Sequence, residues 1–127
     1  MISFDDFTMK DGEPIYQQIL LYIKRGVIAG VIADGDELPS RRMLSALLGV
    51  NPNTVQKAYH LLEEENLIQS LMGSKSTMVV SDEKIARIRE ELLEAEAKGV
   101  VLKLRQMGVT KGDAVALIEK YWEGELP

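Results

Sequence analysis

Apolar residues recur at three- and four-residue spacing in two neighbouring segments between Leu38 and Asn66. The first segment carries Met43, Leu44, Leu47 and Leu48, and the second carries Val55, Ala58, Tyr59 and Leu62. This spacing gathers the apolar side chains of each segment on one face of a helix, where a core can bury them. The pattern therefore predicts two short amphipathic helices, one directly after the other.

The residues at the ends of these segments predict where each helix starts and stops. Ser40 follows Pro39 at an N-cap position, and Gly49 can end the first helix because glycine adopts the left-handed conformation without a Cβ clash. Asn51 is a good N-cap for the second helix, and Pro52 suits its first position, where no N–H is needed. Two helices joined by so tight a break have the layout of a helix-turn-helix, whose second helix reads DNA.

The flanking segments complete this motif. A helix from Pro14 to about Gly30 is predicted by apolar residues at four-residue steps, which are Ile15, Ile19, Ile23 and Val27. After the second motif helix, 67–71 and 76–80 read as short strands around a turn at 72–75. A hairpin in this place is the wing of a winged helix, and a plain surface hairpin is the alternative. Residues 1–80 thus predict a winged helix-turn-helix domain with an N-terminal arm.

Two further amphipathic helices are predicted beyond the hairpin, from Glu83 to about Met107 and from Thr110 onward. The apolar positions that we assign to a dimer surface are Ile85, Ile88, Leu92, Ala95, Leu102, Leu117, Ile118 and Tyr121. The winged helix is complete without these helices, so their apolar faces need another surface. A dimerisation hairpin is the economical interpretation, and a small domain of unknown role is the alternative. We expect a mainly α fold with a small β wing, divided into a DNA-binding domain at 1–80 and a helical dimerisation region at 81–127.

The composition fits a cytoplasmic protein that does not enter membranes. Of the 127 residues 46% are hydrophobic and 28% are charged, which is the usual balance of a globular chain. The chain has no cysteine, which excludes a disulfide framework and a thiolate metal site and fits a reducing compartment. Its acidic N-terminal segment is unlike a signal peptide, and the apolar run at 19–23 is far too short to span a membrane.

The charge distribution matters more than the net charge of −5, which by itself argues weakly against a nucleic-acid partner. Residues 14–80 contain six Lys and Arg and six Asp and Glu, and no acidic residue lies between Leu38 and His60. Because the local field at the groove decides phosphate binding, this segment is compatible with DNA. The alternative is a winged-helix module that binds another protein and not DNA, and the acidic net charge is its only support.

The side chains left facing outward on the motif are of types that bind DNA. Asn53 and Gln56 can each form two hydrogen bonds with the edge of adenine, and Thr54 can bond a base edge or contact a thymine methyl group. The residues that we expect to lie at the phosphates beside them are Ser40, Arg41, Arg42 and Lys57. This combination indicates a helix that reads the base sequence while the neighbouring residues bind the DNA backbone.

Enzymatic or metal chemistry has little support in the sequence. His60 is the only histidine, and no glycine-rich phosphate loop is present. We interpret the acidic run 63–65 as a solvated helix face and not as a pair of catalytic carboxylates, and the acids of the N-terminal arm lack the spacing of a calcium loop. We therefore expect no catalytic residue, no metal and no cofactor.

Three stretches in register resemble the GntR family of bacterial transcription regulators. They are PIYQQI from Pro14, LPSRRMLSALLGVNPNTVQKAY from Leu38, and the end of the wing at 76–79, so the resemblance spans residues 14–80. The short two-helix tail resembles the YtrA-like branch of that family. This resemblance implies that the tail helices form the dimer interface, that no large effector domain follows, and that the regulator represses neighbouring transporter genes.

The resemblance also implies a set of DNA contacts. They fall on Arg42, Asn51, Asn53, Thr54 and Gln56, and on Lys75 and Thr77 of the wing. The wing departs from the family's Gly-Lys/Arg-Gly-Thr pattern, because the run here is Gly-Ser-Lys-Ser-Thr over 73–77. The expected function is a homodimeric, sequence-specific regulator that represses transcription from a palindromic operator. The sequence indicates no particular small-molecule effector.

Overall fold

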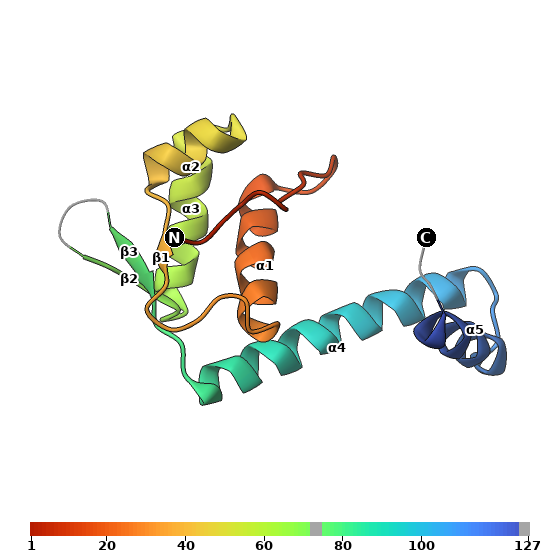
Figure 1. Cartoon of the computed structure of the whole chain (residues 1–127). Helices are drawn as coiled ribbons and strands as arrows, with labels where there is room; N and C mark the ends of the chain where they lie inside the picture. Colours follow the sequence, from red (N-terminus) through yellow and green to blue (C-terminus); the bar gives the residue numbers. More distant parts are fainter. Residues whose placement is uncertain (72–74, 125–127) are drawn as a thin grey trace. The chain divides into compact units, whose positions relative to one another are not determined.

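The computed structural model describes residues 1–71 and 75–124, and Figure 1 traces its elements. In chain order they are α1 (Ile15–Ile28), β1 (Glu37–Leu38), α2 (Arg41–Leu48), α3 (Pro52–Glu64), β2 (Ile68–Ser70), β3 (Ser76–Met78), α4 (Asp82–Gln106) and α5 (Lys111–Glu123). The chain forms two compact units, Met1–Arg89 and Glu90–Pro127. The first unit includes the start of α4, beyond the predicted boundary at residue 80, because Ile88 is only 2% exposed.

The core of the first unit is built on α1 and α3. Helix α1 buries Ile19, Ile23 and Val27 at the expected four-residue steps. Helix α3 buries the four residues predicted for its inward face, which are Val55, Ala58, Tyr59 and Leu62. Both α1 and α2 pack against α3, which lies beside each of them in Figure 1. Helix α3 is therefore packed on two sides.

Helix α2 presents a narrower apolar face to this core than the sequence predicted. Leu44 is fully buried and Leu48 is half-buried, but Met43 and Leu47 are 50% and 61% exposed. The helix has only eight residues and reaches the core along one line of side chains. The expectation that all four apolar residues face inward was wrong for Met43 and Leu47.

The predicted helix boundaries of the motif are confirmed. The Ser40 hydroxyl accepts a hydrogen bond from the Met43 amide at 3.1 Å and so caps α2. Gly49 ends that helix with a φ of 68°, in the left-handed region that glycine adopts without strain. The Asn51 side chain accepts from the Asn53 amide at 2.8 Å, and Pro52 begins α3. These local bonds fix the turn between the two helices.

The wing is part of a three-stranded antiparallel sheet in the order β1-β3-β2. Strand β3 is central: Thr77 is opposite Glu37 on one side and Gln69 on the other. The two predicted hairpin strands are confirmed over 68–70 and 76–78, while the sequence analysis predicted no strand at the position of β1. Residues 72–74, where the sequence predicted the hairpin turn, lie outside the described residues.

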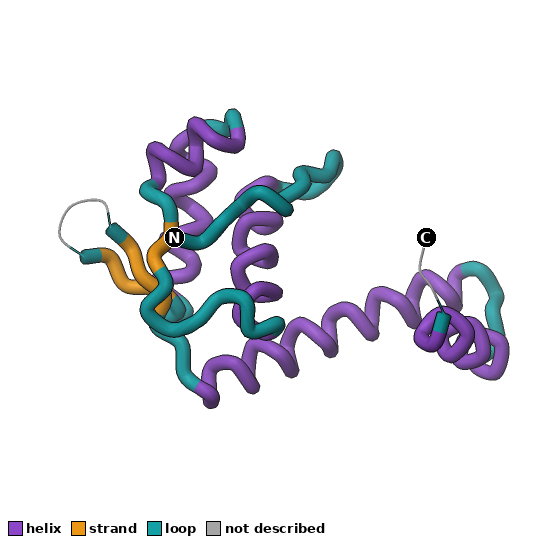
Figure 2. The backbone as a smooth tube through the Cα atoms, in the orientation of Figure 1, coloured by secondary structure: helices purple, strands orange, loops and turns teal. Residues whose placement is uncertain are grey.

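The N-terminal arm packs on the first unit as a loop that passes α1 (Figure 2). The Ile2 amide donates to the Glu37 carbonyl at 2.8 Å, which joins the arm to β1. The Phe4 ring is buried and stacks on Tyr22 of α1 at a centroid distance of 4.9 Å. The Tyr22 hydroxyl donates to the Ser3 carbonyl at 2.8 Å. The aromatic residues of the arm are thus part of the core edge.

The second unit consists of the rest of α4 followed by α5. Gly108 adopts a φ of 74° at the break between the helices, and the Thr110 hydroxyl caps α5 by accepting from the Asp113 amide at 3.2 Å. None of the described residues from 90 to 124 is buried within the chain. Among the described helices, none is long and apolar enough to cross a membrane.

Candidate nucleic-acid interface

The first turns of α3 present polar side chains from a firmly anchored helix. Asn53 and Gln56 are exposed and Thr54 is half-buried, while Val55 between them is fully buried. The side-chain carbonyl of Asn51 accepts the cap bond, which leaves the amide group of this exposed residue as a hydrogen-bond donor. The arrangement offers donors and acceptors for base edges on a helix whose backbone cannot shift freely.

Two basic residues lie exposed beside this helix start. Arg42 on α2 makes no hydrogen bond or ion pair with any described residue. The Lys57 ammonium on α3 lies 4.0 Å from the centre of the Tyr16 ring, so a cation–π contact holds it while it remains exposed. Both positive charges are available to phosphate groups. Ser40, which was predicted with them, is half-buried, and its hydroxyl is engaged in the cap of α2.

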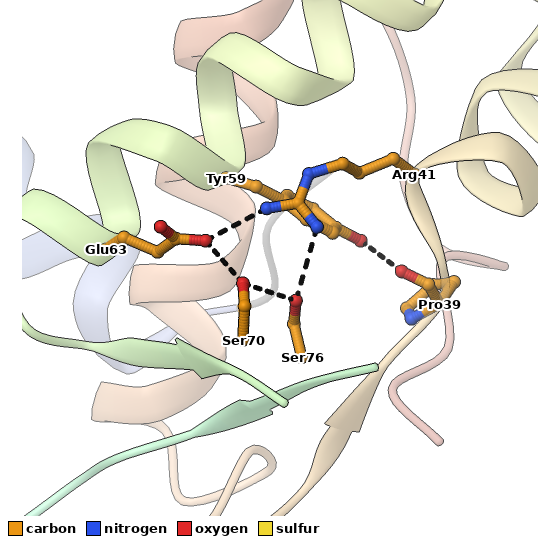
Figure 3. A network of polar contacts seen from close by, with 6 residues as sticks. All are labelled: Pro39, Arg41, Tyr59, Glu63, Ser70 and Ser76. Atoms are coloured by element: carbon orange, nitrogen blue, oxygen red, sulfur yellow. Dashed lines mark hydrogen bonds and ion pairs between the residues drawn. The ribbon is translucent and has the colours of Figure 1, made fainter. Parts of the chain in front are cut away.

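Arg41 differs from its neighbour because its guanidinium is bound inside the first unit (Figure 3). Its Nη2 donates to Glu63 Oε1 at 2.9 Å, and its Nη1 lies 3.5 Å from the Ser76 hydroxyl. The same Glu63 oxygen accepts from the Ser70 hydroxyl at 2.6 Å. Arg41, which was predicted to lie at the phosphates, is thus engaged within the first unit, and Glu63 is part of this network and not only of a solvated acidic face.

Tyr59 lies beneath this network and is fully buried. The Arg41 guanidinium is 5.1 Å from the centre of its ring, and the Tyr59 hydroxyl donates to the Pro39 carbonyl at 2.7 Å. Burial raises the pKa of the Tyr59 hydroxyl well above its usual value, although the Arg41 charge acts in the opposite direction. No local sequence pattern predicts this network, since Arg41 and Glu63 are 22 positions apart.

The wing carries the remaining predicted DNA contacts. Lys75 is exposed, and its ammonium is 3.8 Å from a carboxylate oxygen of Glu37 on β1. Such an exposed pair at this distance contributes little and leaves the lysine free to turn towards a phosphate. Thr77 is half-buried at the centre of the sheet, between its two strand partners. Lys75 is thus the more accessible of the two.

Other chemistry is sparse in the part of the chain that the structure describes. His60 lies 3.0 Å from Glu64 one turn along α3, and both side chains are largely exposed. No group of three or more His, Cys, Asp or Glu side chains among the described residues is arranged to hold a metal ion. The polar residues that converge on one surface are those at the start of α3.

The residues assigned to a dimer surface fall in both units. Ile85 and Ile88 belong to the first unit, where Ile88 is buried, so we remove Ile88 from that surface. In the second unit Leu92 is half-buried, and the other predicted positions are exposed: Ala95, Leu102, Leu117, Ile118 and Tyr121. The sequence analysis missed further exposed apolar residues on the same helices, among them Leu93, Val101 and Val115. The apolar periodicity of these two helices is weaker because charged residues interrupt it.

Comparison with known proteins identifies relatives of this fold and site. Residues 15–79 match the model of a family described as bacterial regulatory proteins, gntR family. The HTH-type transcriptional repressor YtrA of Bacillus subtilis is 37% identical, covering 80% of this chain and 84% of its own. A GntR family transcriptional regulator from Listeria monocytogenes has a similar structure, with a TM-score of 0.77, 29% identity and coverage of 88% of this chain and 98% of that chain. YtrA from Sulfolobus acidocaldarius, a GntR-family transcription factor, is similar over 94% of each chain, with a TM-score of 0.53 and 28% identity.

The family match covers the whole helix-turn-helix and the wing, and the similarity to YtrA extends into the tail helices. These relatives are transcription regulators and not enzymes, which agrees with the polar, non-catalytic surface at the start of α3. The chain belongs to the GntR family of bacterial DNA-binding transcription regulators, in its YtrA-like branch.

Proposed function

We propose that this regulator is a cytoplasmic homodimeric repressor that binds a palindromic operator, with one α3 helix in each of two major-groove half-sites. Asn53, Thr54 and Gln56 contact base edges, and Arg42 and Lys57 hold the phosphates on either side of the groove. Lys75 of the wing contacts the flanking backbone. The similarity to a repressor supports repression as the outcome of binding, and the branch resemblance supports a transporter operon as its target.

The observation that carries this proposal is the two-sided character of α3. Its inner face is fixed by Val55, Ala58 and Tyr59, each with no exposed surface, while Asn53 and Gln56 point away from the core. A base-reading side chain must hold its geometry within a fraction of an ångström, and a rigid helix provides this better than a loop. Helix α3 combines that rigidity with amide side chains suited to adenine.

The dimer is supported by the apolar surface of the second unit. No described residue there is buried within the chain, although several large apolar side chains occur on α4 and α5. A shallow groove on α4 is lined by the apolar side chains Leu93, Ala97, Val101 and Leu102. Helices in proteins draw most of their stability from packing an amphipathic face, and exposed apolar patches mark interaction surfaces. A second copy of the chain supplies a matching apolar surface by symmetry.

The demands of target search also favour two copies. Non-specific DNA binding has a Kd of about 10⁻⁴–10⁻⁶ M, and a genome offers on the order of 10⁶ or more competing sites. One winged helix reads too few base pairs to select one operator against that background. Two copies related by a two-fold axis read two half-sites whose centres lie about one helical turn apart, or a multiple of it.

Selection of bound sequences from a random DNA pool tests the operator. We expect enrichment of an inverted repeat whose half-sites are spaced by about one turn or a multiple, followed by a match upstream of the regulator's own gene. Enrichment of a single asymmetric half-site, or of no sequence, contradicts the proposal.

Sedimentation of the full chain tests the dimer. We expect a dimer for the natural protein, and a monomer with weakened operator binding for Leu102→Glu, since Leu102 is 58% exposed on α4. The matched control is Val31→Glu, which places the same charge at an apolar residue that is 78% exposed in the first unit. This control should remain dimeric. A monomeric natural protein, or equal dissociation of both variants, contradicts the proposed interface.

A further inference from the structure

A network of polar side chains joins the wing to the reading helix, α3. Glu63 lies in the last turn of α3, and its Oε1 accepts hydrogen bonds from Arg41 on α2 and from Ser70 on β2. Arg41 also reaches Ser76 on β3, which is 1% exposed, and the two serine hydroxyls are 3.4 Å apart. Four elements therefore meet at one carboxylate oxygen and one guanidinium group (Figure 3).

In the part of the chain that the structure describes, no other side chain of α3 makes a hydrogen bond to a side chain of the sheet. The remaining links there are backbone bonds at the connection, such as the Leu67 amide to the Leu62 carbonyl at 2.9 Å. Those links fix where β2 starts, and the pairing of β1 with β3 holds the other edge of the sheet. The Glu63–Ser70 bond adds a side-chain tie between α3 and the far end of β2, which further restrains tilting of the hairpin against the helix.

Arg41 is held in place by more than its ion pair. Its side chain is 26% exposed, and its guanidinium packs over the buried Tyr59 ring at 5.1 Å. Its Nε is buried and has no hydrogen-bond partner among the described residues, so its other two nitrogens make the polar contacts of the group. Turning Arg41 towards DNA would remove the charge that balances Glu63. Its neighbour Arg42 makes no such ion pair with a described residue.

We propose that the Arg41–Glu63 pair positions the wing relative to the reading helix, so that both contact one DNA site together, and that Arg41 itself touches no phosphate. This inference rests on the proposed function, in which α3 and the wing bind the same operator half-site. A hairpin without this additional restraint must be ordered further when DNA binds, and that ordering lowers affinity. The Arg41–Glu63 pair orders the hairpin against α3 before DNA arrives.

The test measures operator affinity against salt concentration in four full-length variants. Arg41→Met and Glu63→Gln each remove one charge while keeping a side chain of similar size, and their combination completes a double-mutant cycle. Ser70→Ala removes the bond from β2 to Glu63 together with the 3.4 Å contact to Ser76, on a residue that is exposed. Binding is measured at a temperature where thermal melts show every variant fully folded, so that lost stability does not appear as lost affinity.

The matched control is Lys24→Met. Lys24 on α1 pairs with Glu65, just past the end of α3, at 2.8 Å, and the two side chains are 13% and 36% exposed. That pair resembles Arg41–Glu63, which has a distance of 2.9 Å and side chains that are 26% and 35% exposed. The Lys24–Glu65 pair, however, connects to α1 of the core and not to the wing. A general effect of losing an ion pair near the end of α3 would appear in both.

We expect Arg41→Met and Glu63→Gln each to weaken operator binding by about tenfold, which corresponds to the loss of one good interaction. The double variant should be no weaker than either single one, and Ser70→Ala should lose a few-fold. The slope of log affinity against log salt should stay as in the natural protein in all of them, since no phosphate contact is lost. Lys24→Met should bind normally.

Two results overturn the inference. One is a slope flattened by about one unit in Arg41→Met, which would make Arg41 a phosphate ligand. The other is unchanged operator affinity in folded Arg41→Met and Glu63→Gln. If Arg41→Met does not fold, Glu63→Gln and Ser70→Ala decide the matter by the same criteria. Failure of the natural protein itself to bind DNA with salt dependence would instead overturn the proposed function, so the two failures are distinct.

Discussion

Replacing Arg42 by Ala isolates one phosphate contact at little cost to the fold. Arg42 is exposed on α2 and makes no hydrogen bond or ion pair with a described residue, so its removal breaks no observed internal contact. Each phosphate neutralised on duplex DNA contributes about −0.9 to the slope of log affinity against log salt. The variant should therefore bind with a slope about 0.9 less steep.

The size of the effect follows from that slope. Between 50 and 200 mM salt the concentration changes about fourfold, so one phosphate contact changes affinity by about 3.5-fold over this interval. The ratio of the two Kd values, variant over natural protein, should thus be about 3.5 times larger at 50 mM than at 200 mM. Fluorescence anisotropy with a labelled operator at five or six salt concentrations resolves this difference.

Two controls separate phosphate contact from net charge. Arg42→Lys keeps the charge and should keep the slope. Arg87→Ala removes one charge from an exposed position on α4, outside the helix-turn-helix, and should also keep it. An Arg42→Ala slope equal to that of the natural protein would refute the phosphate role of Arg42, provided that circular dichroism shows a folded variant.

Three further substitutions test the packing that supports the site, each read out by chemical denaturation. Tyr59→Phe removes the bond to the Pro39 carbonyl and should destabilise by about 1 kcal/mol. The pKa of Tyr59 in the folded chain is raised above its usual 10.0, so in the unfolded chain Tyr59 loses its proton at a lower pH. Stability should therefore be full below about pH 10 and fall above it, with a change in the unfolding constant of up to tenfold per pH unit. Tyr59→Phe should show a shallower fall. Asn66→Ala should cost about 1 kcal/mol because Asn66 has a φ of 59°, and Asn66→Gly should not. Leu44→Ala should cost about 2–5 kcal/mol, since Leu44 is fully buried, and a loss below 1 kcal/mol would place it outside the core.

Much of the helix-turn-helix could be predicted because its signals are local. Ser40 and Asn51 cap helices with bonds to amides two or three residues ahead, and Gly49 has the left-handed conformation expected of it. Such interactions depend only on neighbouring residue types, which a sequence displays directly. The exposed placement of Asn53 and Gln56 followed from the same helical spacing.

What could not be predicted depends on contacts between distant segments. Arg41 looked like a second phosphate ligand beside Arg42, and only the packing of α2 against α3 brings it to Glu63. Strand β1 has two residues and forms only because β3 offers it an edge, so it has no period of its own. Ile88 fits the apolar spacing of α4 as well as any residue of the tail, yet the first unit buries it.

Comparing Gln56→Ala with the natural protein, on the selected operator and on random DNA, tests directly whether α3 reads the sequence. Gln56 is exposed near the start of α3, beside the buried Val55 that fixes the helix. If its amide forms two bonds to a base edge, its loss should cost about 1–3 kcal/mol on the operator and much less on random DNA. Equal losses on both DNAs, or no loss on either, would contradict the claim that α3 reads the sequence.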